Sequence, residues 1–128
     1  MKYKIIDRIK LIREEKGLSQ VEFSLEVGIT NSAISLYESH KDFPSYKLLT
    51  KLLTYCEIDI NHELFANKLR GYRINHVFTT RQLCQLLDIN FPQLCNVLNN
   101  KMKYSMKSVL KICYELHFDI YELLIFPE

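Results

Sequence analysis

The chain has 128 residues, of which 48% are hydrophobic and 25% are charged, as in an ordinary globular protein. The apolar runs are only a few residues long, which argues against a membrane span, and three glycines and three prolines are too few for a β-sandwich. The formal net charge of +2 is too small to identify a partner. Positions 65–128 carry 8 basic against 5 acidic residues, which favours polyanions more than positions 1–64, with 9 against 10.

The first predicted helices have defined ends. Isoleucines at helical spacing predict a helix over residues 5–16, which Gly17 ends. Ser19 stands where an N-cap belongs, and Glu22 three residues later completes a capping box for a second helix. Gly28 then follows as the expected left-handed residue at the end of that helix.

Three further helices are expected before residue 66. Thr30 caps the third helix, and residues 40–44 form a loop that contains a proline. Ser45 caps a leucine-rich fourth helix. A short fifth helix is expected to end near Leu64 and Phe65.

The apolar pattern repeats at an offset of sixty residues. Nine apolar positions of the first half match nine of the second. They are Phe23, Val27, Ile29, Ile34, Tyr37, Leu49, Leu52, Leu53 and Cys56, which correspond in this order to Leu83, Leu87, Ile89, Leu94, Val97, Val109, Ile112, Cys113 and Leu116. Nine matches at one offset indicate an internal duplication. We therefore expect an all-α fold of two tandem five-helix units, residues 1–66 and 67–128. The units should pack together, because no Gly/Ser-rich linker separates them.

The stretch LSQVEFSLEVGITNSAISLYE, residues 18–38, has the pattern of a helix-turn-helix. Its short motifs are Leu18-Ser19-Gln20, Gly28-Ile29-Thr30, Ile34-Ser35 and Tyr37-Glu38. With these motifs at this spacing, residues 5–65 resemble the lambda-repressor-like family of regulators, also called the xenobiotic-response-element type. The second unit resembles that family by its apolar pattern alone, as a degenerate copy. The resemblance implies a sequence-specific DNA-binding regulator, of the repressor type found in phages and mobile elements.

The resemblance also implies which side chains would face DNA. A helix of this size fits the major groove with its N-terminal residues at base edges, so residues 30–38 would read the bases. Gln20 would bond a phosphate at the start of its own helix. The other expected contacts are Thr30, Asn31, Ser32, Ser35, His40 and Lys41. The alternative is that these residues are ordinary caps and solvated surface, which applies most strongly to Thr30.

The remaining polar residues suggest structure rather than catalysis. The resemblance implies a structural salt bridge between Arg13 and Glu38. The four histidines lack metal-ligand spacing, and no Ser–His–Asp or Cys–His set has supporting context, so we expect no enzyme activity, metal or cofactor. The cysteines at 56, 84, 95 and 113 lack the close pairing of a zinc site. Reduced thiols, buried except at position 95, suit a cytoplasmic protein.

The second unit departs from the pattern where the first would read DNA. Asn31, Ser32 and Ser35 correspond to Phe91, Pro92 and Cys95, and Leu98 replaces Glu38, although Arg73 keeps the place of Arg13. An outward-facing Phe91 with Pro92 favours a dimerisation or packing surface. The alternative is an auxiliary DNA contact through Gln93, Asn96, Lys101 and Lys103.

Two classes of function remain open from the sequence. The first is a regulator that binds double-stranded DNA. We expect it to bind as a homodimer, because a single DNA-binding domain with few phosphate contacts binds weakly. The second is an inhibitor or adaptor that covers a protein partner, such as an antitoxin or an anti-defence protein. The absence of Arg and Lys from residues 30–38 keeps this alternative open.

Overall fold

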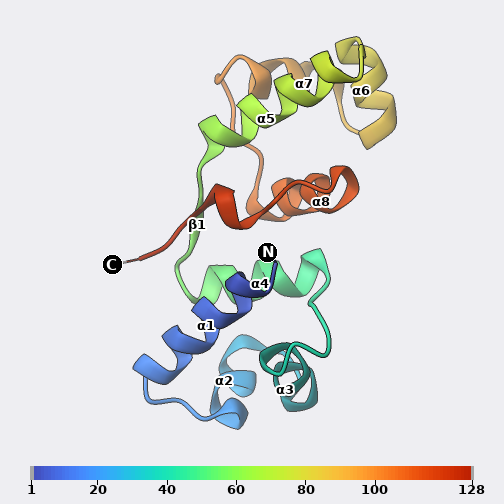
Figure 1. The fold of residues 1–128 in the computed structure, drawn as a ribbon. Helices are drawn as coiled ribbons and strands as arrows, with labels where there is room; N and C mark the ends of the chain where they lie inside the picture. The colour runs from blue at the N-terminus through green and yellow to red at the C-terminus, as the bar shows by residue number, and fades with distance from the viewer. Residues whose placement is uncertain (1, 128) are drawn as a thin grey trace.

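A computed structural model describes residues 2–127, which form eight α-helices, one 3-10 helix and a two-stranded sheet (Figure 1). The first half contains α1 (Tyr3–Glu15), α2 (Gln20–Val27), α3 (Asn31–Glu38), α4 (Tyr46–Tyr55) and β1 (Asp59–Ile60). The second half contains α5 (His62–Asn75), α6 (Thr80–Leu87), α7 (Phe91–Leu98), α8 (Met106–Leu116), η1 (Tyr121–Leu123) and β2 (Leu124–Ile125). Among residues 2–127, no helix is both long and apolar enough to cross a membrane.

The predicted caps of the first half are confirmed. Ser19 accepts a hydrogen bond from the Glu22 amide and Glu22 accepts one from the Ser19 amide, so the capping box at the start of α2 is complete. Thr30 and Ser45 cap α3 and α4 by accepting hydrogen bonds from the Ala33 and Leu48 amides. These short polar side chains satisfy amides that a helix leaves unpaired in its first turn, which is why they locate the helix starts.

The prediction of a short fifth helix ending near Leu64 and Phe65 is wrong. Instead α5 runs from His62 to Asn75, because no proline interrupts it and Phe65 and Leu69 are buried on one side of it. The helix thus fills the place expected for the last helix of one unit and the first helix of the next. It also crosses the expected boundary between residues 66 and 67, and five separate helices in each half are not observed within residues 2–127.

The described residues are mostly helical, consistent with the expected all-α fold, and one small sheet is added to it. Asp59 and Ile60 of β1 pair in antiparallel fashion with Ile125 and Leu124 of β2. The paired segments lie far apart in the sequence and have two residues each. No local pattern of such length distinguishes a strand from a loop.

The repeated apolar positions form the core. Of the eighteen positions matched at an offset of sixty, only Val27 and Ile89 are partly exposed, and both pack against the core. The predicted burial of Cys56, Cys84 and Cys113 is also confirmed, whereas Cys95 is half-buried. A helical stripe of apolar residues thus predicted the inward faces in both halves.

The two halves pack through α4 and α8, which lie side by side in the middle of the molecule, between α1–α3 and α5–α7 (Figure 1). The Tyr114 hydroxyl on α8 donates to the carbonyl oxygen of Pro44 at 2.7 Å. The Tyr114 ring also lies 6.3 Å from Tyr46 and 6.4 Å from Phe43, centroid to centroid. Burial raises the pKa of Tyr114, so its hydroxyl stays protonated and remains a donor at this junction.

The backbone repeats its turns as well as its helices. Left-handed conformations occur at Gly17, Gly28, His40 and Glu57, and again sixty residues later at Val77, Asp88, Asn100 and His117. Val77 is the unusual member, because a β-branched side chain is strained at a positive φ. Its φ is 55°, against 72° for Gly17, and 87% of the residue is exposed.

Exchanging valine and glycine at these two turns should change stability in opposite directions. Val77→Gly should raise the free energy of unfolding by about 1 kcal/mol, because it relieves backbone strain and removes no buried contact. Gly17→Val should lower the free energy of unfolding by a similar amount. A Cβ at Gly17 meets no atom within 4 Å, so the cost comes from backbone strain at a positive φ alone. Urea unfolding of both variants measures this, and a stability loss in Val77→Gly contradicts the strain.

Candidate nucleic-acid interface

The helix-turn-helix of the first half is built from α2, a tight turn and α3. Gly28 adopts φ 82° and ψ 35°, a left-handed conformation in which glycine carries no steric penalty. Its amide closes the end of α2 on the Ser24 carbonyl at 2.9 Å. Thr30 then starts α3 by accepting from the Ala33 amide at 3.2 Å. Local chemistry therefore sets the angle between α2 and α3.

A buried carboxylate joins three helices behind this turn. Arg13 of α1 donates from Nε to Glu38 Oε2 at 2.8 Å and from Nη2 to Oε1 at 2.9 Å. The two side chains are only 10% and 7% exposed. Arg13 Nη1 also donates to the Leu18 carbonyl at 2.7 Å, and Gln20 Nε2 donates to Glu38 Oε1 at 3.0 Å. The predicted Arg13–Glu38 pair is thus a two-point contact that also includes Gln20.

The expected phosphate ligand Gln20 is therefore partly committed inside the protein. Its residue is half-buried, and one amide proton is used by Glu38. The amide group carries a second N–H, which makes no hydrogen bond within residues 2–127. Gln20 can meet a phosphate only with this second proton.

Three polar side chains at the start of α3 are exposed and unpaired. Asn31, Ser32 and Ser35 all face solvent, and their side chains make no hydrogen bond within the described part of the chain. Thr30 is exposed too, although its hydroxyl oxygen already accepts from Ala33. Asn31, Ser32 and Ser35 offer short donors and acceptors at a helix N-terminus, which suits contact with base edges.

The two expected contacts in the following loop differ from each other. His40 Nε2 lies 2.7 Å from Asp7 Oδ1, and the His40 ring stacks on Tyr3 at 4.6 Å between centroids. The imidazole thus contacts α1, a partner that the sequence did not indicate. Lys41 is exposed, its backbone amide donates to the Leu36 carbonyl, and its side chain makes no hydrogen bond to any other described residue. Its ammonium group is free to approach a phosphate.

The second half repeats the same scaffold with other residues. Thr79 and Gln82 form the capping box of α6, and Asp88 takes the left-handed position that ends it. Asn90 caps α7, and Pro92 lies in the first turn, where a proline is readily accommodated. The backbone of α6 and α7 is therefore similar to that of α2 and α3, while the side chains of α7 differ from those of α3.

The expectation that Phe91 faces outward is wrong. Phe91 is half-buried and packs against the core, and the Arg81 guanidinium carbon lies 4.2 Å from the centroid of its ring. A cation over an aromatic face is an attractive contact, so Phe91 is covered by its own chain. Of the two residues expected to form this surface, Phe91 and Pro92, only Pro92 is exposed.

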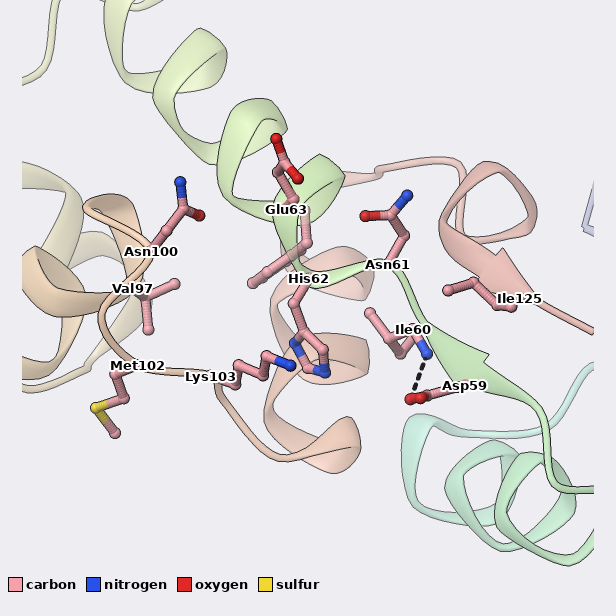
Figure 2. A pocket seen from close by; sticks show the side chains of 11 residues that line it. Asp59, Ile60, Asn61, His62, Glu63, Val97, Asn100, Met102, Lys103 and Ile125 are labelled. Atoms are coloured by element: carbon pink, nitrogen blue, oxygen red, sulfur yellow. Dashed lines mark hydrogen bonds between the residues drawn. The ribbon is translucent and has the colours of Figure 1, made fainter.

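Two of the expected auxiliary contacts, Gln93 and Lys103, line the same cavity of about 390 Å³ between the start of α7 and the loop before α8. Gln93, Asn96 and Lys101 are exposed. Lys103 is exposed too, and it also lines a second cavity of about 560 Å³ between α5 and the loop before α8, where Figure 2 shows its ammonium group beside the His62 ring. Burial and the nearby Lys103 lower the pKa of His62, so this imidazole is neutral at pH 7.

Comparison with known proteins supports the first half as a DNA-binding module. Residues 9–62 match a family model described as Helix-turn-helix. The matched family is one of DNA-binding regulator domains, not of enzymes, and the match covers α2, the turn and α3 in full. No curated protein and no solved structure matches the chain.

Three contacts of this region had no clear signal in the sequence. They are the Asp7–His40 contact, the Arg81–Phe91 stack and the Gln20–Glu38 hydrogen bond. Each joins residues at least ten positions apart, beyond the reach of helical periodicity. Gln20 and Glu38 both belong to the helix-turn-helix motif, but the motif did not indicate that they contact each other.

Truncation of Arg13 should destabilise the protein far more than truncation of its counterpart Arg73. Arg13→Ala leaves the Glu38 carboxylate buried without its main partner, which should cost about 3–5 kcal/mol. Arg73→Ala removes only the hydrogen bond to the Phe78 carbonyl at 3.2 Å, which should cost about 1 kcal/mol. Equal urea midpoints for the two variants would show that the pair contributes nothing beyond that hydrogen bond.

Proposed function

We propose that the protein is a sequence-specific DNA-binding transcriptional regulator, a repressor of the phage or mobile-element type. The observation that carries this proposal is the group Asn31, Ser32 and Ser35, which is exposed and unpaired at the N-terminus of α3. The Arg13–Glu38 pair holds α3 against α1 and so orients this group. In the proposed complex, residues 30–38 enter the major groove while Gln20 and Lys41 contact phosphates. His40 would contribute a phosphate contact only by leaving Asp7.

We further propose that the chain consists of two tandem lambda-repressor-like units, residues 1–66 and 67–128, with α5 continuous across the boundary. The recurrence of four left-handed turns at an offset of sixty supports a common origin. So do the capping boxes of α2 and α6. The second unit would then be a degenerate copy, because the positions of Asn31 and Ser35 hold Phe91 and Cys95.

Loss of the polar group should weaken DNA binding without unfolding the protein. The double variant Asn31→Ala with Ser35→Ala should lose about 1–3 kcal/mol for each base contact and become less selective. Thr54→Ala, which removes an exposed hydroxyl from α4, is the matched control and should bind as the wild type does. Gel shifts on fragments selected from genomic DNA measure affinity, and circular dichroism checks the helices. Unchanged affinity in the double variant would exclude this reading surface.

A homodimer is the proposed binding form, because two heads on a pseudo-palindrome give useful affinity. Sedimentation at micromolar concentration should give twice the chain mass of 15.2 kDa. Pro92 is the proposed contact at the exposed tip of α7, and Pro92→Asp suits the second position of a helix. This variant should shift the protein toward monomer. A monomeric wild type excludes the dimer, and a dimeric Pro92→Asp variant places its interface elsewhere.

One observation favours a second candidate function. The exposed face of α2 carries Val21 and Leu25, which are 52% and 78% exposed, and α3 contains no basic residue. An inhibitor or adaptor that covers a protein partner, as an antitoxin or anti-defence protein does, would use such a surface. Gel shifts with a salt titration separate the two functions, since binding to phosphates weakens steeply as salt rises.

A further inference from the structure

The buried ion pair of the first half has an incomplete counterpart in the second half. Arg73 occupies the position of Arg13, and Thr80 occupies that of Gln20. The carboxylate is missing, because Leu98 stands where Glu38 would be. The second half therefore keeps the cation of this pair and lacks the anion.

Arg73 is held in the same way as Arg13. Arg13 donates from Nη1 to the Leu18 carbonyl, and Arg73 donates from Nη1 to the Phe78 carbonyl, sixty residues later. In Arg13 the Nε and Nη2 groups then bind the carboxylate. In Arg73 the same two groups have no hydrogen-bond partner within residues 2–127. A guanidinium held by one edge thus presents a free pair of donors, with the spacing that suits two oxygens of one anion.

A cavity of about 180 Å³ lies beside Arg73. It is lined by Arg70, Arg73, Thr80, Cys95, Leu98 and Asn99. Arg70 is fixed by hydrogen bonds to the Leu98 carbonyl and the Asn67 side chain, so the lining contains two oriented guanidinium groups. No carboxylate lines the cavity, and neither arginine has an acidic partner within 4.0 Å among the described residues.

The neighbouring helix adds to the positive potential. Thr80 is the first residue of α6, and the N-terminal end of a helix carries a partial positive charge. Its hydroxyl and the Asn99 amide are further groups that can donate a hydrogen bond to an anion. Two arginines and two neutral donors thus face one small space.

We propose that this cavity binds an oxyanion, a phosphate group in particular, with Arg73 as its two-point ligand and Arg70 as its second cation. The anion takes the place that the Glu38 carboxylate fills in the first half. Two sources share this chemistry: free inorganic phosphate and a phosphodiester of DNA. The second source rests on the proposed function, since Thr80 corresponds to Gln20, the expected phosphate contact of the first half.

The first experiment uses the wild-type chain and inorganic phosphate. Phosphate is titrated at constant ionic strength, with chloride as the balancing anion, while NMR follows the amides of Thr80 and Asn99 and the Nε–H of Arg73. Saturable shifts at these three groups, and absent at Arg13, support the site. Shifts that rise linearly, or that spread over all surface lysines, would overturn it.

Replacing Leu98 with the missing acid gives a matched pair of variants. Leu98→Glu should pair with Arg73 and abolish the saturable response to phosphate, whereas Leu98→Gln has the same size without the charge. At neutral pH, Leu98→Glu should unfold at a higher urea concentration than Leu98→Gln, and this advantage should disappear in acid, where the carboxylate is protonated. If Leu98→Glu is the less stable variant at neutral pH, the cavity does not accept an anion.

The third experiment identifies the source of the anion. Binding to a short duplex of random sequence is measured against salt concentration. Arg73→Gln should reduce the slope of log affinity against log salt by about one, the effect of one lost phosphate contact. Lys107→Gln, which removes an exposed charge outside the cavity, is the control and should change it less. Equal slopes for the two variants assign the site to free phosphate. If the wild type binds no such duplex, DNA is not the source of the anion and the phosphate titration alone decides the site, whereas the proposed function is judged by the gel shifts on genomic fragments.

Discussion

The carboxylate of Glu38 is the point on which the first half of the protein depends. It is nearly buried, so its charge must be neutralised and its oxygens hydrogen-bonded inside the protein; Arg13 of α1 supplies the opposite charge, and Gln20 of α2 donates a further hydrogen bond. Satisfying one anion therefore places α1, α2 and α3 together. The exposed polar residues of α3 have a defined position relative to α2 because of this contact.

Packing of α4 against α8 places the two halves relative to each other. The contact is mostly apolar, and the Tyr114 hydroxyl adds a directional bond to the Pro44 carbonyl, in the loop that follows α3. Phe43 and Tyr46, on either side of that proline, also contact the Tyr114 ring. Tyr114 of α8 therefore contacts the loop that follows α3 directly.

The second half keeps the backbone of the first and changes its chemistry. Its capping box, its left-handed turns and its buried stripe all recur. Its polar positions do not, since Phe91 replaces Asn31 and is covered by Arg81, and the buried Leu98 replaces the Glu38 carboxylate. Backbone geometry depends on caps and core residues, whereas ligand chemistry depends on surface residues, so the two can diverge separately.

The sequence by itself determined the helix starts, the turn of the helix-turn-helix and the inward faces. Ser19, Thr30 and Ser45 act on amides within three residues, and apolar periodicity depends only on the helix repeat. Only the tertiary structure decided the length of α5, the β1–β2 pairing, the cover over Phe91 and the partners of Gln20 and His40. These features arise from contacts between segments that are distant in the chain, and such contacts exist only after the helices have packed.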